Sequence, residues 1–94
     1  MLLQINYLIR SKQDGKYLVA RTPGAGDTEV SYLLVFHHDY DAMSYINTHG
    51  KEFSDRLSVE TASPTQLKGL MQRWNYQGFG IVKDPLLPEI QFVS

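Results

Sequence analysis

The chain has 94 residues, 43% apolar and 20% charged, which is the size and composition of one globular domain spanning residues 1–94. Nine Lys and Arg residues are balanced by ten Asp and Glu residues, and this disfavours nucleic-acid binding, because phosphate contacts need a basic excess. The absence of cysteine excludes disulfides, thiolate nucleophiles and cysteine-based zinc sites.

Two alternating segments at the start of the chain predict a β-hairpin. Apolar and polar residues alternate over Leu3–Arg10, which is typical of a half-buried strand. Asp14 and Gly15 both tolerate a positive φ and predict a tight turn. Tyr17–Arg21 is expected to return as the second strand, and the polar, glycine-containing segment 22–29 to form a loop.

The middle of the chain predicts a buried strand followed by a helix. Tyr32–Phe36 is apolar without alternation, as in a central strand that is covered on both faces. We expect a helix over Tyr40–His49, with Asp39 as its N-cap and Gly50 in the left-handed conformation after its end. One face of this helix would carry Ala42, Tyr45, Ile46 and His49.

A second strand–helix pair follows a polar loop. Segment 50–56 is expected to be that loop, with Phe53 as its apolar anchor, and Leu57–Thr61 alternates as a strand. Ser63 and Gln66 form a capping box with proline between them, which is a strong signal for a helix start. The core face of this helix is predicted to be Leu67, Leu70, Met71 and Trp74.

The remaining segments complete the predicted fold. Phe79–Lys83 and Glu89–Val93 are expected to be strands joined by a proline-containing turn. The order is therefore β-β-β-α-β-α-β-β. We predict an α+β (α/β-like) domain, with one mixed sheet of about six strands and two helices packed on it.

The junction after the third strand is the strongest candidate for a ligand site. His37 and His38 lie beside Asp39 and Asp41, and imidazole and carboxylate groups can bind metals or polar ligands. The simpler interpretation assigns the carboxylates to the helix start and the histidines to the surface. Adjacent strand residues point to opposite faces, so we predict no metal site here.

The turn between the last two strands carries Leu86 and Leu87. We expect these side chains to fold back over the sheet, and the alternative is that they form an interaction surface. An open sheet also leaves unpaired edge strands, which favours a homodimer.

No assembled catalytic motif is found in the sequence. The segment Gly24–Gly26 lacks the Gly-Lys-Ser/Thr ending of a phosphate loop, and no Gly-x-Ser-x-Gly motif occurs. We therefore expect a non-enzymatic interaction or regulatory module without a cofactor, which self-associates and binds an unidentified protein partner. The alternative is a small-ligand or metal-binding domain that uses His37–Asp41. No apolar run reaches the roughly 20 residues of a membrane span, so we expect a cytoplasmic protein without membrane contact.

Two resemblances bear on the fold. Tyr32–Phe36 and the helix entry at residues 37–42 are similar to the corresponding part of SseB-like (enhanced serine sensitivity) N-terminal domains, and residues 57–93 follow the same element order. The whole chain more closely resembles small cyanobacterial proteins without an assigned activity, through residues 5–10, 15–21 and 84–88. Both resemblances imply a fold, and neither implies a reaction or catalytic residues.

Overall fold

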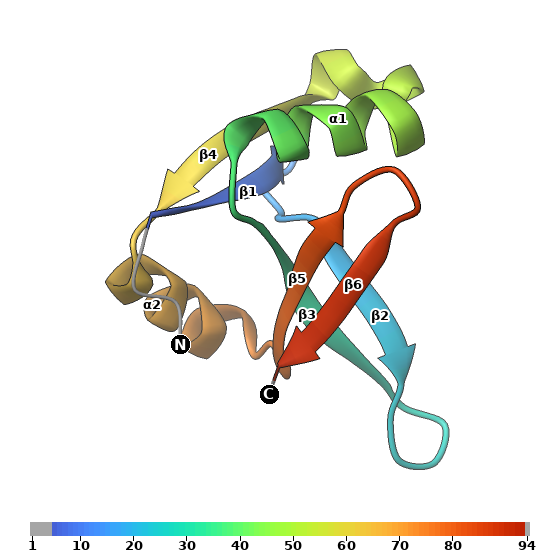
Figure 1. Cartoon of the computed structure of the whole chain (residues 1–94). Helices are drawn as coiled ribbons and strands as arrows, with labels where there is room; N and C mark the ends of the chain where they lie inside the picture. The colour runs from blue at the N-terminus through green and yellow to red at the C-terminus, as the bar shows by residue number, and fades with distance from the viewer. Residues whose placement is uncertain (1–4, 94) are drawn as a thin grey trace.

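A mixed six-strand sheet lies between two helices in the computed structural model, which describes residues 5–93 (Figure 1). The predicted α+β fold and its element order are confirmed. Within the described residues, neither helix is long and apolar enough to cross a membrane. The elements are β1 (Asn6–Ser11), β2 (Val19–Pro23), β3 (Glu29–Phe36), α1 (Asp39–His49), a 3-10 helix (Lys51–Arg56), β4 (Leu57–Ala62), α2 (Pro64–Trp74), β5 (Gly78–Asp84) and β6 (Glu89–Val93).

The sheet is arranged around β3. Its strand order is β4-β1-β3-β5-β6, with β2 also paired to β3. Only β3 and β5 run parallel among the paired strands of residues 5–93, and the other pairs are antiparallel. Since β5 occupies one edge of β3, β1 and β2 share the opposite edge. On this edge of β3, β1 pairs only with Phe36, and β2 pairs with Glu29–Leu33.

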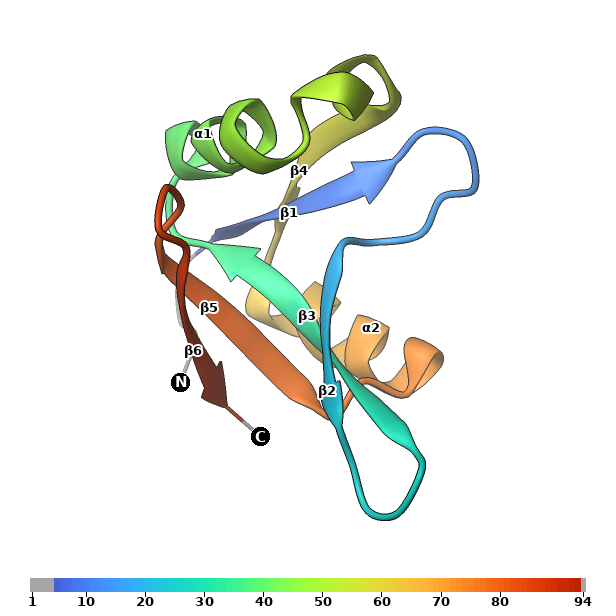
Figure 2. The same ribbon diagram turned by 90° about the vertical axis from the view of Figure 1, so that its right-hand side faces the viewer.

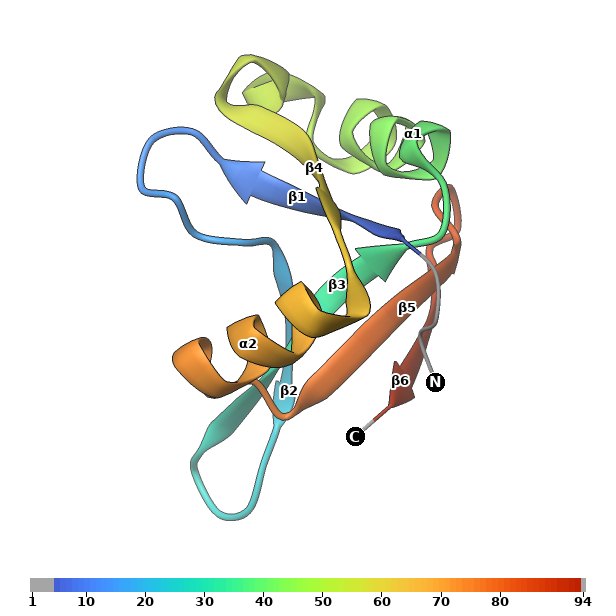
Figure 3. The same ribbon diagram turned by 90° about the vertical axis from the view of Figure 1, so that its left-hand side faces the viewer.

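The side chains of β3 alternate between two hydrophobic cores, which confirms its prediction as a doubly covered strand. Leu34 and Phe36 pack in the core that contains Ile46 of α1. Leu33 and Val35 pack in the core that contains Leu67 of α2. Figures 2 and 3 show the two helices on opposite sides of the sheet.

The prediction that the first strand is half-buried is wrong. Leu8 and Ile9 are neighbours that point to opposite faces, and both are buried, one in each core. The alternation predicted one exposed face incorrectly, because α1 and α2 cover β1 from both sides. Ile5, expected on the buried face, is 52% exposed, and Leu3 lies outside the described residues.

The predicted hairpin forms its turn but not its ladder. Gly15 has φ 72°, and the Ser11 N–H donates to the Lys16 carbonyl at 2.8 Å. Beyond the isolated bridge between Arg10 and Tyr17, the chain leaves β1. Leu18 marks the transfer, because its N–H donates to Ile9 of β1 and its carbonyl accepts from Leu34 of β3. The second strand therefore pairs with β3 rather than with β1.

Helix α1 begins one residue earlier than predicted. His38 is its N-cap, without a side-chain hydrogen bond, and Asp39 is the first helical residue, so the prediction of Asp39 as N-cap is wrong. Asp39 and Asp41 both lie in the first turn, where negative charge complements the helix dipole. Gly50 has φ −136° and is not left-handed, because the chain continues directly into a 3-10 helix instead of reversing.

That 3-10 helix replaces the predicted loop over 50–56. Phe53 is 51% exposed in it and does not serve as the expected anchor. The short helix follows α1 closely, since the Phe53 N–H donates to the Gly50 carbonyl at 2.9 Å.

The capping box of α2 is confirmed. The Ser63 hydroxyl accepts the Gln66 N–H at 3.2 Å, and the Gln66 side-chain oxygen accepts the Ser63 N–H at 2.8 Å. Burial falls along the predicted core face from Leu67, which is 1% exposed, to Trp74, which is 39% exposed. The helix therefore approaches the sheet at its N-terminal end, and Trp74 is not a core residue.

Substitution of two glycines by alanine is expected to change the stability of the fold in opposite directions. A Cβ on Gly80 would lie 3.0 Å from Leu34 Cδ2 and 3.1 Å from Ile90 Cγ2, so we expect Gly80→Ala to destabilise the fold by roughly 1–3 kcal/mol. A Cβ on Gly69, in the middle of α2, would meet no atom within 4 Å, so Gly69→Ala should stabilise the fold by about 1 kcal/mol. Urea unfolding midpoints measure both changes. Shifts in the same direction would contradict this account.

Candidate interaction surface

Strand β6 forms an open edge of the sheet. It pairs with β5 from Phe79↔Val93 to Asp84↔Glu89, and its other edge has no strand partner within residues 5–93 (Figure 2). An unpaired edge presents backbone N–H and C=O groups that another strand can bind. Proteins usually protect such edges with lysine or proline, and β6 contains neither.

Apolar side chains accompany this open edge. Phe92 is 46% exposed and Val93 is 39% exposed. The inner side of the Phe92 ring contacts Tyr32 of β3, with 4.8 Å between ring centroids. Gly80 on the intervening strand leaves the space for this contact, since it is paired with Phe92 and carries no side chain. The outer side of Phe92 remains accessible.

The β5–β6 turn holds two leucines in solvent. The Asp84 carboxylate accepts the N–H groups of Leu86 at 2.9 Å and Leu87 at 3.3 Å. His49 Nε2 lies 2.9 Å from the Pro85 carbonyl, to which its N–H donates, so the end of α1 is linked to the turn. Leu86 is 60% exposed and Leu87 77% exposed, so the expectation that they fold back is wrong. Polar contacts, rather than leucine packing, hold the turn.

The His37–Asp41 segment lies at the surface. His37, His38 and Asp39 are exposed, and Asp41 is partly buried. The ring of His38 stacks on Tyr40, with centroids 4.8 Å apart and an interplanar angle of 5°. Within the described part of the chain, no group of three or more acidic or histidine side chains could hold a metal ion. The carboxylates occupy the first turn of α1, which is where a helix favours negative charge.

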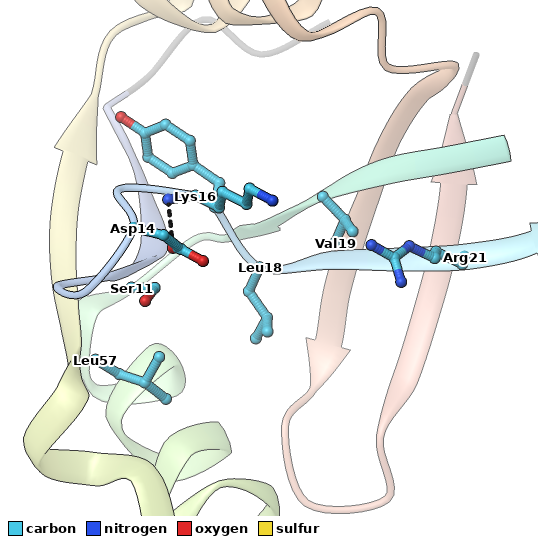
Figure 4. Close-up of a pocket in the computed structure, with 8 residues that line it drawn as sticks. Ser11, Asp14, Lys16, Leu18, Val19, Arg21 and Leu57 are labelled. Carbon is cyan, nitrogen blue, oxygen red and sulfur yellow. Dashed lines mark hydrogen bonds between the residues drawn. The ribbon is translucent and has the colours of Figure 1, made fainter.

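An open hollow of about 470 Å³ lies where β1 and β2 separate (Figure 4). The Asp14 carboxylate accepts the Lys16 N–H at 3.0 Å, and this hydrogen bond lowers the pKa of Asp14. Figure 4 shows Asp14, Lys16 and Arg21 spread along the hollow rather than facing a common point. The hollow therefore lacks the convergent polar groups that a small-molecule site needs.

Sequence reasoning missed a polar cluster formed by Arg10, Tyr17 and Glu60. Arg10 Nη1 lies 3.4 Å from Glu60 Oε2, and its Nε donates to the Gly15 carbonyl at 2.9 Å. The guanidinium lies 5.1 Å from the centroid of the Tyr17 ring, and the Tyr17 hydroxyl donates to Glu60 at 3.5 Å. Glu60 is 50 residues from Arg10 along the chain, so only the β1–β4 register reveals the cluster.

The tyrosine of this cluster is held protonated. Burial raises the pKa of Tyr17 first, and the negative charge of Glu60 raises it further. The positive charges of Arg10 and Arg73 lower that pKa, but each by less than burial raises it. The Tyr17 hydroxyl is therefore a hydrogen-bond donor at all ordinary pH values.

Comparisons with family models, with curated proteins and with solved structures found no match to this chain.

The Tyr17 pKa gives a test of the cluster. We expect Glu60→Gln to lower it, because a negative charge beside the phenol is removed. A carbon-detected NMR titration of Tyr17 Cζ measures the change, and Glu52→Gln, an exposed change in the 3-10 helix, serves as the control. Because the pKa of Tyr17 is higher in the folded chain than the unfolded value of about 10, the protonated phenol stabilises the fold below about pH 10. This stabilisation is lost as the pH rises through the folded pKa. An unchanged Tyr17 titration in Glu60→Gln would contradict the cluster.

Proposed function

We propose that this chain is a non-enzymatic interaction module that associates with a second copy of itself through the open edge of β6. The observation that carries the proposal is the coincidence of an unpaired strand edge with the exposed apolar side chains Phe92 and Val93. Either feature alone is common in globular proteins, and together they favour strand addition.

The β6 sequence suits antiparallel pairing about a two-fold axis. With the axis at Gln91, this residue lies opposite Gln91 of the partner subunit. Ile90 then lies opposite Phe92 of the partner subunit, and both point to the same face of the sheet. Ile90 and Phe92 of the two copies thus meet across the interface, and the two sheets join into one.

The charges of the strand do not oppose this pairing. Glu89 is the only charged residue of β6 and would lie opposite Val93 of the partner subunit. The two Glu89 residues would be separated by four residues, or roughly 13 Å. That distance exceeds the screening length of about 8 Å at physiological ionic strength.

The opposite sheet edge, β4, is a weaker candidate. Its apolar residues Leu57 and Val59 are partly buried and pack against the core beneath α1. Strand β6, in contrast, exposes Phe92 and Val93. Pairing through β4 would therefore remove less exposed apolar surface from solvent than pairing through β6.

The turn leucines support the same arrangement. In the antiparallel pair, the 84–88 turn of one copy lies beyond the end of β6 in the other. Leu86 and Leu87 would then lie near Val93 of the partner subunit. Three exposed apolar side chains of each copy would lose solvent contact on association.

Charge at position 91 tests the two-fold pairing. Gln91→Lys places two lysines directly opposite each other, and like charges there cost up to about 1 kcal/mol, or roughly a fivefold rise in the dimer Kd. Gln91→Glu should weaken the dimer similarly. An equimolar mixture of the two variants should form a heterodimer in preference to either homodimer, as measured by native mass spectrometry.

Thr61→Lys places the same charge on the exposed surface of β4, at the other sheet edge, and should leave the dimer unchanged. High salt should reduce the effect of Gln91→Lys, because it screens the charges. A monomeric parent chain, or a dimer that is insensitive to charge at position 91, would contradict the proposal.

A further inference from the structure

A second concave surface lies at the far side of the sheet from β6. Helix α2 and strands β1 and β4 enclose an open groove of about 480 Å³, within the size range of small-molecule sites. On the helix, Gln66, Gly69, Leu70 and Arg73 share one face at the spacing i, i+3, i+4, i+7. The opposite wall is made by Leu8, Arg10, Tyr17, Glu60, Thr61 and Ala62.

The groove carries one positive charge in excess. The Arg10 guanidinium is neutralised by Glu60 at 3.4 Å and fixed by the Gly15 carbonyl. Arg73 is exposed on the groove wall and, within residues 5–93, has neither an ion pair nor a side-chain hydrogen bond. Arg73 lines the same groove as the polar cluster of Arg10, Tyr17 and Glu60. Its charge weakly lowers the pKa of Tyr17. A monoanion would balance this charge.

Gly69 leaves the helix side of the groove bare. Glycine in the middle of an exposed helix costs about 1 kcal/mol relative to alanine. Packing does not require it, because a Cβ there would meet no atom within 4 Å. Its effect is to open the groove wall between Gln66 and Arg73, so that a flat group can approach the helix backbone.

We propose that this groove binds a small organic acid with a hydroxyl group at its other end. The carboxylate pairs with the Arg73 guanidinium, which matches a carboxylate with two parallel donors. The apolar body lies against Gly69 and Leu70. The hydroxyl donates to Glu60, whose contacts to Arg10 and Tyr17 are long at 3.4–3.5 Å and leave room for another donor.

Binding of 4-hydroxyphenylacetate tests this assignment, because it has a carboxylate, a flat ring and a hydroxyl donor. Titrated into the ¹⁵N-labelled full chain, it should cause saturable NMR shifts at the amides of α2 and β4 at millimolar concentration. Arg73→Gln should weaken binding about tenfold, because a charge-assisted pair is lost. Arg21→Gln, a matched change at an exposed position of β2, should not alter the Kd.

Changes to the ligand and to Gly69 separate the two ends of the site. 4-Hydroxyphenylacetamide, which lacks the anion, and phenylacetate, which lacks the hydroxyl, should each bind more weakly than 4-hydroxyphenylacetate. Gly69→Leu should block the groove while the amide spectrum stays dispersed, since the site is exposed. Failure of the native chain to give saturable shifts, or equal binding by Arg73→Gln or by the amide, would overturn the proposal.

Discussion

The full enclosure of β3 is the constraint on which the rest of the structure depends. This strand uses both faces and both edges: Leu34 and Phe36 face α1, Leu33 and Val35 face α2, and strands lie on either side. An apolar strand of this kind is stable only when both faces are covered. The two helices therefore lie on opposite faces of the sheet. Within residues 5–93, the strands β4, β6 and β2 each pair with a single neighbouring strand.

The shared edge of β3 has a consequence for chemistry at the surface. Because β2 pairs with the same edge of β3, β1 pairs with β3 only at Tyr7 and then separates from it. Leu18 bridges the two strands through its backbone and turns the chain from one to the other. The preceding residue, Tyr17, is thereby held beside Arg10, and the β1–β4 pairing adds Glu60. A requirement of sheet geometry thus assembles the polar cluster.

The sequence predicted those features that depend on neighbouring residues. The Ser63–Gln66 capping box and the apolar strand before α1 are local, and both are confirmed. Burial of β1 on both faces depends on helices formed much later in the chain. The turn that exposes Leu86 is linked to His49 of α1 through the Pro85 carbonyl, and the Arg10–Glu60 pair forms through the β1–β4 register. Contacts between residues this far apart leave no trace in a local pattern, so the sequence predicts neither the exposed leucines of the turn nor the polar cluster.

The two proposed surfaces can operate together because the sheet separates them. The proposed ligand groove is lined by residues of α2, β1 and β4, whereas the proposed self-association would use β6, at the opposite end of the strand order. Strand β3 lies between them in the strand order, and none of its residues lines the groove. Pairing through β6 therefore leaves Arg73 and Gly69 accessible, and a dimer would present two independent grooves at its outer ends.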